Sequence, residues 1–257
     1  MPFAERTVQA ADCQIQYLED GDGAAVVMLH GAGGLRRDEQ VFAALASHYR
    51  LLVPSQPGFD GSTPGLAATI PDVADVMAAF IGATVGRASV IGESFGGAVA
   101  SWLAVRHPQV VERLILAAPA GLNDPASGPR LASLSPADMA VLLYGRPPSE
   151  QPSPAVAEQR QRNRANAFRL MGGRAYDADL AAQLGTVAAP TLIVWGTADQ
   201  MIPSSRAAQI AERIPGAQVV LLNGAPHVLS AAVPDQFLPP VLGFLEAARP
   251  VSRSATT

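Results

Sequence analysis

The stretch Ala88-Ser89-Val90-Ile91-Gly92-Glu93-Ser94-Phe95-Gly96-Gly97 decides the fold of this 257-residue chain. Its first four residues form an apolar run typical of a buried strand, and residues 98–105 carry apolar side chains at helical spacing. Between them, Ser94 has glycine two positions before and after it, the pattern of a tight strand-to-helix turn that exposes a serine hydroxyl. Side chains at Gly92 and Gly96 would collide in such a turn, and the start of a helix favours developing negative charge. We therefore predict that Ser94 is a nucleophile, the alternative being an ordinary tight turn.

The rest of the chain continues this alternation of strand and helix. Further strand-like runs occupy residues 25–29, 51–54, 114–117, 191–195 and 218–222, and residues 3–8 and 13–18 predict an antiparallel pair before them. Helical patterns bounded by Pro or Gly occupy residues 39–47, 72–85, 94–106, 204–214 and 235–248. The sequence thus predicts an α/β fold with a mostly parallel central β-sheet flanked by helices.

Residues 121–189 interrupt the alternation, because they contain no strand-like run and are rich in Pro, Arg and Gln. Helical patterns return at residues 135–144 and 155–171, separated by a Pro-rich linker. We predict that residues 121–189 form a helical lid inserted into a core made of residues 1–120 and 190–250. The small, polar residues 251–257 predict a flexible tail.

A serine hydroxyl needs a base to remove its proton, and the chain has four histidines. His48 and His107 lie at helix ends, where His107 is expected to face solvent, and His30 precedes glycines in a setting suited to shaping a loop. His227 ends the loop Asn223-Gly224-Ala225-Pro226-His227 after the last strand-like run. This loop should emerge at the same sheet edge as Ser94, so we predict that His227 is the base; the alternative is a surface histidine.

The base needs a carboxylate to hold its tautomer and stabilise the imidazolium. Asp199 ends Trp195-Gly196-Thr197-Ala198-Asp199, directly after a strand-like run, and completes the chain order Ser, acid, His. Helix capping ahead of Pro203 is the alternative role for Asp199, and Asp124 is the second-choice acid. Asp177 and Asp179 are expected to be solvated lid residues or helix caps.

Attack on a carbonyl carbon produces an oxyanion that needs backbone N–H donors. The loop His30-Gly31-Ala32-Gly33-Gly34 follows a strand-like run and is predicted to supply one donor from Ala32, with Gly33 as second choice. Phe95, directly after the nucleophile, is predicted to supply the other. A phosphate-binding turn is the alternative, but this loop lacks the Lys and Ser/Thr of a P-loop.

Together these motifs resemble the α/β-hydrolase superfamily, in particular its lid-bearing, lipase-like and carbon–carbon-bond-hydrolase-like branch. The resemblance covers almost the whole chain. It includes residues 53–62, similar to the family's loop after the fourth strand, and residues 195–199, similar to its acid turn. The chain departs from the family pattern at Ser55, where the family often has Asp, and at Pro226, where it often has Gly.

One predicted lid helix contains a cluster of Arg and Asn residues. At helical spacing Arg162, Asn166 and Arg169 share one face. One interpretation is a solvated helix face; the other is a substrate-binding face, with one arginine pairing with a substrate carboxylate. Gly31 is a further candidate substrate-binding residue.

Three functions fit these residues. The first is hydrolysis of a small carboxylic ester, lactone or thioester through an acyl-enzyme at Ser94. The same residues are also compatible with perhydrolysis. The second is hydrolysis of a carbon–carbon bond in a ring-cleavage diketone, as in similar lidded family members. The third is a hydrolase-like ligand receptor with little turnover. Dehalogenase and epoxide hydrolase chemistry is disfavoured, because the related enzymes have Asp where this chain has Ser94.

The composition limits the partners. A net charge of -4 without a basic cluster argues against nucleic-acid binding, and no window approaches the roughly 18 apolar residues of a membrane span. We expect a soluble, cytoplasmic protein that acts on a small molecule; the sequence does not specify its oligomeric state. The single cysteine, Cys13, is expected to be a buried and inert strand residue. The scattered histidines indicate no metal site, and the proposed chemistry needs no cofactor.

Overall fold

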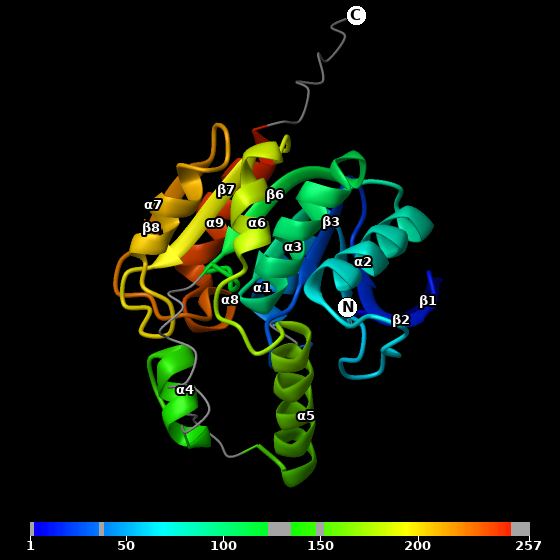
Figure 1. The fold of residues 1–257 in the computed structure, drawn as a ribbon, viewed down its shortest axis with the longest axis horizontal. Helices are drawn as coiled ribbons and strands as arrows, with labels where there is room; N and C mark the ends of the chain where they lie inside the picture. The colour runs from blue at the N-terminus through cyan, green and yellow to red at the C-terminus, as the bar shows by residue number, and fades with distance from the viewer. Residues whose placement is uncertain (1–2, 36–38, 123–134, 148–151, 248–257) are drawn as a thin grey trace, which may run out of the picture.

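The computed structural model describes residues 3–35, 39–122, 135–147 and 152–247. Within them the chain forms an eight-stranded sheet in the order β1-β2-β4-β3-β5-β6-β7-β8 (Figure 1). The strands are β1 (Ala4–Ala10), β2 (Cys13–Asp20), β3 (Ala25–Leu29), β4 (Arg50–Pro54), β5 (Ala88–Glu93), β6 (Val111–Ala117), β7 (Thr191–Gly196) and β8 (Gln218–Leu222). All eight predicted strands are present, several of them longer by a few residues at their ends.

The sheet combines an antiparallel edge with a parallel centre. β1 pairs with β2 and β2 with β4 in antiparallel fashion, whereas every pair from β4 through β3 to β8 is parallel. The predicted antiparallel pair and mostly parallel sheet are therefore confirmed. Because parallel strands end at one edge, the loops after β3, β5, β7 and β8 all emerge there, and these loops carry the predicted site residues.

Helices cover both faces of the sheet, and alternate strand residues face opposite layers. On one face Val27 and Leu29 of β3 pack with α2 (Ile70–Thr84), α3 (Phe95–Arg106) and α7 (Ser205–Ala211). On the other face Val26 and Met28 pack with α1 (Glu39–Ala46) and α9 (Pro234–Glu246). Burial on both faces explains why the central strands read as continuous apolar runs.

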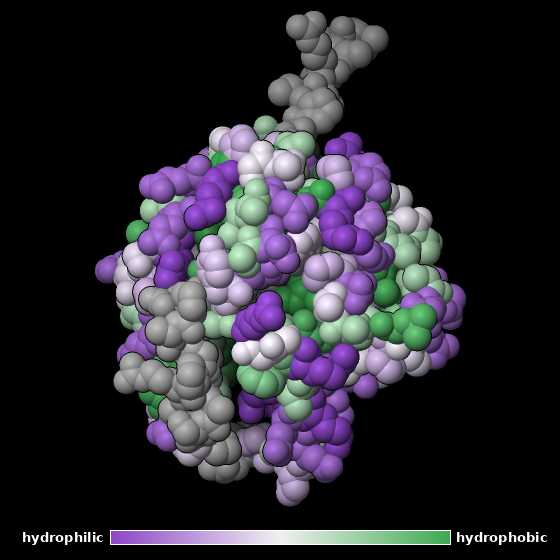
Figure 2. Space-filling model, in the orientation of Figure 1, coloured by the Kyte–Doolittle hydropathy of each residue, from purple (hydrophilic) through white to green (hydrophobic). Residues whose placement is uncertain are grey.

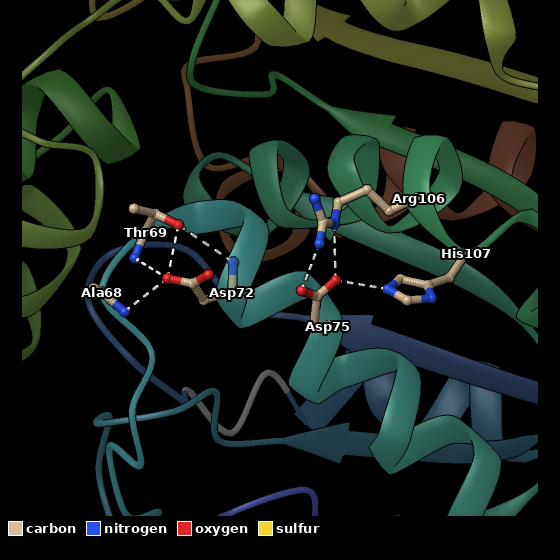
Figure 3. A network of polar contacts seen from close by, with 6 residues as sticks. All are labelled: Ala68, Thr69, Asp72, Asp75, Arg106 and His107. Carbon is tan, nitrogen blue, oxygen red and sulfur yellow. Dashed lines mark hydrogen bonds and ion pairs between the residues drawn. The ribbon is translucent and has the colours of Figure 1, made fainter.

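Polar contacts cap the start of α2 and join α2 to the end of α3 (Figure 3). Thr69 caps α2 in a capping box with Asp72, whose carboxylate accepts the N–H groups of Ala68 and Thr69. One turn further along α2, Asp75 accepts two hydrogen bonds from Arg106 at the end of α3. Asp75 also lies 2.7 Å from His107 Nε2. The expectation that His107 faces solvent holds in part: its side chain is 26% exposed, and Asp75 holds it.

Between β6 and β7 the described chain contains α4 (Pro136–Tyr144), α5 (Pro154–Leu170) and α6 (Ala178–Gln183). In Figure 1, α4 and α5 lie below the carboxyl edge of the sheet, whereas α6 lies beside α3. α4 and α5 match the two predicted insertion helices to within a residue at each end. The sequence did not predict α6 or α8 (Leu229–Ala232), both short helices. Asp177 caps α6, which is one of the two roles expected for it.

The described residues contain no helix long and apolar enough to span a membrane.

Candidate active site

Ser94 occupies the tight turn between β5 and α3. Its backbone has φ 54° and ψ −115°, a strained conformation for a residue with a side chain. A Cβ on Gly92 would lie 2.4 Å from the Gly96 carbonyl oxygen, and one on Gly96 would lie 2.2 Å from the Leu29 carbonyl oxygen. The predicted need for glycine at both positions is confirmed, because a side chain on Gly92 would push α3 away from β5 and one on Gly96 would push α3 away from β3.

Three side chains from separate loops form one hydrogen-bonded series at this edge. His227 Nδ1 lies 2.7 Å from Asp199 Oδ2, and His227 Nε2 lies 2.9 Å from Ser94 Oγ. A carboxylate only accepts hydrogen bonds, so the ring is protonated at Nδ1 and its Nε2 accepts the Ser94 hydroxyl proton. The side chains of Asp199 and His227 are fully buried, whereas Ser94 is half-buried. The geometry allows proton transfer from a hydroxyl that a ligand can reach.

Asp199 is held by several donors besides His227. Its Oδ1 accepts the N–H groups of Met201 (2.8 Å) and Ile202 (2.9 Å), and its Oδ2 also accepts Trp195 Nε1–H (3.0 Å). These bonds fix the orientation of the carboxylate. The second-choice acid, Asp124, lies outside the described residues. The sequence alone indicates no role for Trp195, although this residue begins the predicted acid turn.

His30 shapes the glycine loop after β3. Its Nε2 accepts the Gln56 N–H (3.1 Å) and its Nδ1–H donates to the Gly31 carbonyl (2.8 Å), which also accepts the Gly34 N–H (3.1 Å). Burial lowers the pKa of His30, against the opposing effects of its bond to Gly31 and of Asp60. The buried ring is therefore neutral at pH 7, and it holds the loop rather than transferring protons to Ser94.

The same bonds set the direction of a candidate oxyanion donor. The Gly31 carbonyl and the Ala32 N–H belong to one planar peptide and point in opposite directions, so fixing the carbonyl also fixes the N–H. A Cβ on Gly31 would lie 3.5 Å from Ser94 Cβ, which places this loop against the nucleophile turn. In the part of the chain that the structure describes, the N–H groups of Ala32 and Phe95 donate to no protein acceptor.

A buried carboxylate next to Ser94 joins two of the loops. Glu93 accepts the Ser230 N–H at 3.0 Å and the Ser230 hydroxyl at 2.8 Å, and both residues are buried. Ser230 lies in α8, three residues after His227, so this contact connects the strand that carries Ser94 to the segment that carries the base. The sequence contained no signal for it beyond a charged residue inside an apolar strand.

The helices of the insertion contact the segment of His227 and the loop after β4. The Val228 N–H, next to His227, donates to the Leu143 carbonyl of α4 at 2.9 Å. On α5, Asn166 donates to the Pro57 carbonyl and Arg169 to the Ala67 carbonyl. Arg162 is exposed and pairs with Glu158 on the same helix.

A cavity of about 570 Å³ lies where α5 meets the loop after β4. Asn166 and Arg169 line it together with Gly58, Ser62 and residues 64–68. Its lining does not include Ser94, Asp199 or His227, so it does not coincide with the hydrogen-bonded series. The outer part of α5 is covered mainly by hydrophilic side chains (Figure 2).

Among the described residues, no group of three or more His, Cys, Asp or Glu side chains is arranged to hold a metal ion. Asp199 is engaged with His227, and His227 with Ser94.

A strained serine turn, a buried His–Asp pair and a glycine loop on a mostly parallel sheet define the class of α/β-hydrolase folds. The chain belongs to the alpha/beta hydrolase family, whose profile matches residues 26–239.

Individual relatives are distant. RutD of Agrobacterium fabrum, provisionally named a carbamate hydrolase, is 25% identical over 88% of this chain and 94% of its own. The 2-hydroxy-6-oxo-6-(2'-aminophenyl)hexa-2,4-dienoic acid hydrolase of Metapseudomonas resinovorans is 26% identical over 98% of this chain and 94% of its own. The structure of carboxylesterase CesB from Bacillus subtilis superposes with a TM-score of 0.78 at 21% identity, covering 97% of this chain and 93% of its own. The last likeness concerns the fold alone.

Proposed function

We propose that this protein is a serine hydrolase that cleaves a small carboxylic ester, lactone or thioester through an acyl-enzyme on Ser94. The observation that carries the proposal is the hydrogen-bonded series from Asp199 through His227 to Ser94, at 2.7 Å and 2.9 Å. Membership of a hydrolase family supports it. The relatives' named substrates, a carbamate and a dienoic acid, differ from each other, so they do not select a substrate.

The proposed reaction begins with attack of Ser94 Oγ on the carbonyl carbon while His227 Nε2 takes the hydroxyl proton. The bond from the carbonyl carbon to the leaving oxygen or sulfur breaks, and His227 returns the proton to the leaving group. A water molecule then attacks the acyl-enzyme, giving one proton to His227, which passes it to Ser94 as the acyl–Oγ bond breaks. Asp199 remains ionised throughout and stabilises the imidazolium.

The oxyanion formed in both half-reactions is proposed to bind the N–H groups of Ala32 and Phe95, with the Gly33 N–H as the alternative loop donor. Two features support this assignment: the bond from His30 that directs the Ala32 peptide, and the position of Gly31 against Ser94.

The insertion is proposed to act as a lid that forms one wall of the substrate site. The contacts of α4 with the His227 loop and of α5 with the glycine loop support this role. Gly31, which lies against Ser94, is proposed to border the reacting carbon. Asn166 and Arg169 are the candidates for binding an acidic group of a substrate at the cavity between α5 and the loop after β4.

A second candidate function is hydrolysis of a carbon–carbon bond in a ring-cleavage diketone. It is favoured by the relative named for a hydroxy-oxo-dienoic acid, which matches 98% of this chain. The scissile bond in such a substrate lies beside a carbonyl group, so the same serine and oxyanion hole serve the reaction.

The test has two parts. A fluorophosphonate probe followed by peptide mapping should label Ser94 in the wild type, and Ser94→Ala should remove the label. A panel of p-nitrophenyl esters, lactones, thioesters, a carbamate and a vinylogous diketone should then identify the class turned over. We expect ester turnover to fall by roughly 10⁴-fold or more in Ser94→Ala.

The matched control is Ser47→Ala, which removes an exposed hydroxyl that donates to the nearby Ala44 carbonyl and should change neither labelling nor turnover. A labelled Ser94 with turnover of the diketone but of no ester would select the second function. An unlabelled Ser94, with no turnover of any panel member, would instead select a ligand receptor.

A further inference from the structure

One polar residue of α5 is buried although the helix is otherwise largely exposed. Asn163 has an exposed fraction of 1%, and it shares the buried face of α5 with Ala167 and Leu170. An amide placed inside a protein destabilises the fold unless its donors and acceptor are hydrogen-bonded. The contacts of Asn163 therefore indicate what this side chain does.

Those contacts are with the two loops that flank the candidate active site. Asn163 Nδ2 donates to the Gly33 carbonyl at 3.0 Å and to Asp60 Oδ1 at 2.8 Å. Asn163 Oδ1 accepts the Asp60 N–H at 3.3 Å and Gln159 Nε2–H at 3.0 Å. One amide thus binds the glycine loop after β3 and the loop after β4 at once.

Asp60 extends this contact along the glycine loop. Its Oδ2 accepts the Leu35 N–H at 2.6 Å, so Asn163 and Asp60 together hold the loop at Gly33 and at Leu35. Asp60 has a positive φ of 46°, which is strained for a residue with a side chain. Gly34 has φ +89°, and a Cβ there would lie 2.0 Å from Asn163 Nδ2. The backbone at Asp60 and Gly34 therefore adopts unusual conformations where it contacts the Asn163 amide.

We propose that Asn163 is a positioning residue for the oxyanion hole. The side-chain N–H of Asn163 donates to the Gly33 carbonyl, and the ring N–H of His30 donates to the Gly31 carbonyl. The Gly31 carbonyl shares its peptide with the Ala32 N–H, and the next peptide, which carries the Gly33 N–H, lies between the two fixed carbonyls, so neither N–H can turn away from Ser94. This inference rests on the proposed serine hydrolase function.

A positioning role of this kind acts on the transition state more than on substrate binding. The oxyanion exists only after attack. If its N–H donors point in the wrong direction, kcat therefore falls and KM stays nearly unchanged. It also makes α5 of the insertion part of the catalytic apparatus, in addition to any contact that it makes with substrate.

The first experiment compares Asn163→Ala with Gln161→Ala. Gln161 is an exposed amide two residues away on the same helix, so its variant controls for loss of an amide from α5. For p-nitrophenyl acetate we expect kcat of Asn163→Ala to fall roughly 10- to 100-fold, with KM within about twofold of the wild type. Gln161→Ala should match the wild type in both constants.

A second variant separates loop positioning from folding. The exchange Asn163→Asp with Asp60→Asn keeps a donor and an acceptor between the two side chains, and keeps acceptors for the Asp60 and Leu35 N–H groups. It presents a carboxylate oxygen instead of an N–H to the Gly33 carbonyl. The exchange moves the charge from exposed residue 60 to buried residue 163, so we expect a lower unfolding temperature than in the wild type. Measured well below that temperature, kcat should remain at least about 10-fold reduced.

Hydrogen exchange gives a readout that does not depend on turnover. The Gly34 and Leu35 amides, which donate to the Gly31 carbonyl and to Asp60, should exchange at least about 10-fold faster in Asn163→Ala, and those of α3 should not change.

Wild-type kcat in Asn163→Ala and in the double variant, together with unchanged exchange at Gly34 and Leu35, would overturn the positioning role. Equal loss of kcat in Asn163→Ala and Gln161→Ala would do the same, because it would point to a general effect of α5. These outcomes differ from failure of the proposed function, in which Ser94 of the wild type is not labelled by the fluorophosphonate probe.

Discussion

Trp195 donates its indole N–H to Asp199 at 3.0 Å, and the oxygen that accepts it, Oδ2, is the one that faces His227 Nδ1. The same indole N–H is shared with the Ile202 carbonyl at 3.0 Å. Trp195 is fully buried at the end of β7, so the sheet itself holds the candidate acid in place. A carboxylate oxygen that accepts from both sides has little freedom to rotate, which keeps the imidazole in one orientation.

Replacing Trp195 with Phe tests this contact. The variant keeps most of the buried ring and loses one donor to a charged group, which corresponds to about 1.5–3 kcal/mol. We expect kcat/KM for an ester to fall roughly 10-fold, since 1.4 kcal/mol is a factor of ten, and urea unfolding to show a moderate loss of stability. Trp102→Phe is the matched control, because Trp102 Nε1–H donates to a different carboxylate, Asp177, at 2.8 Å. A similar loss of activity in both variants would contradict a specific role for Trp195.

Replacing Asp199 with Asn should impair turnover through the histidine tautomer. The Met201 and Ile202 N–H groups need an acceptor, so they hold the amide oxygen and turn the new NH₂ toward His227. His227 Nδ1 must then accept, which protonates Nε2 and removes the acceptor for the Ser94 proton. In serine proteases the corresponding change lowers kcat about 10⁴-fold, and we expect a loss of that order. Steady-state kinetics would measure it, with Asp177→Asn as the control; a loss below about tenfold would contradict the assignment.

The candidate site could be predicted where it depends on strand ends. Ser94, Asp199 and His227 each follow a strand-like run, and the parallel sheet brings those ends to one edge, so sequence order and motif sufficed. The face that α5 buries could not be predicted in the same way. The interpretation that grouped Arg162, Asn166 and Arg169 differs by one position from the buried face.

That face consists of Asn163, Ala167 and Leu170. One position is about 100° of rotation around a helix, and the apolar content of α5 is too low to fix its phase. Only docking against the glycine loop makes Asn163 an interior residue. The Glu93–Ser230 contact was equally hidden, because α8 is a four-residue helix with no periodic pattern to predict it.

Cys13 should be unreactive in the folded protein. Burial, with the neighbouring Asp12 carboxylate, raises the pKa of its thiol to about 11, and the residue has no exposed surface. At pH 8 the reactive thiolate is therefore scarce, and reagent cannot reach it. An Ellman assay should titrate no thiol in buffer and one per chain in guanidinium chloride. Prompt reaction in buffer would contradict the buried position of this strand.

Asp75 should contribute to stability in a pH-dependent way. Burial alone would raise the pKa of Asp75, but hydrogen bonds from Arg106 and His107 outweigh it and lower the pKa below the ordinary value of 3.8 (Figure 3). A carboxyl whose pKa is lower in the folded state stabilises the fold above its unfolded pKa, and this stability is lost as the pH falls through the folded pKa. Asp75→Asn should therefore lower the free energy of unfolding near pH 7.

The size of the Asp75 effect is limited by solvent. The Asp75 side chain is 38% exposed, so screening reduces its contribution to at most about 1 kcal/mol. Urea unfolding at pH 7 and at pH 3 should show the difference between wild type and Asp75→Asn shrinking at the lower pH. A difference that grows on acidification would mean that the pKa of Asp75 is raised by folding.

Glu93 and Ser230 should matter for turnover because they join the nucleophile strand to the base segment. Glu93→Leu removes the two carboxylate oxygens that accept from the buried Ser230 N–H and hydroxyl, and each such hydrogen bond to a charged group contributes about 1.5–3 kcal/mol. We expect this variant to unfold at lower urea and to lose kcat as α8 shifts His227.

Glu93→Gln retains an oxygen for the Ser230 N–H, and the serine hydroxyl can rotate to accept from the new NH₂. This variant should therefore keep most of its stability and of its kcat. The comparison of the two variants separates hydrogen bonding from charge: if Glu93→Gln loses as much kcat as Glu93→Leu while remaining stable, the carboxylate acts through its charge on His227 and the contact with Ser230 is secondary.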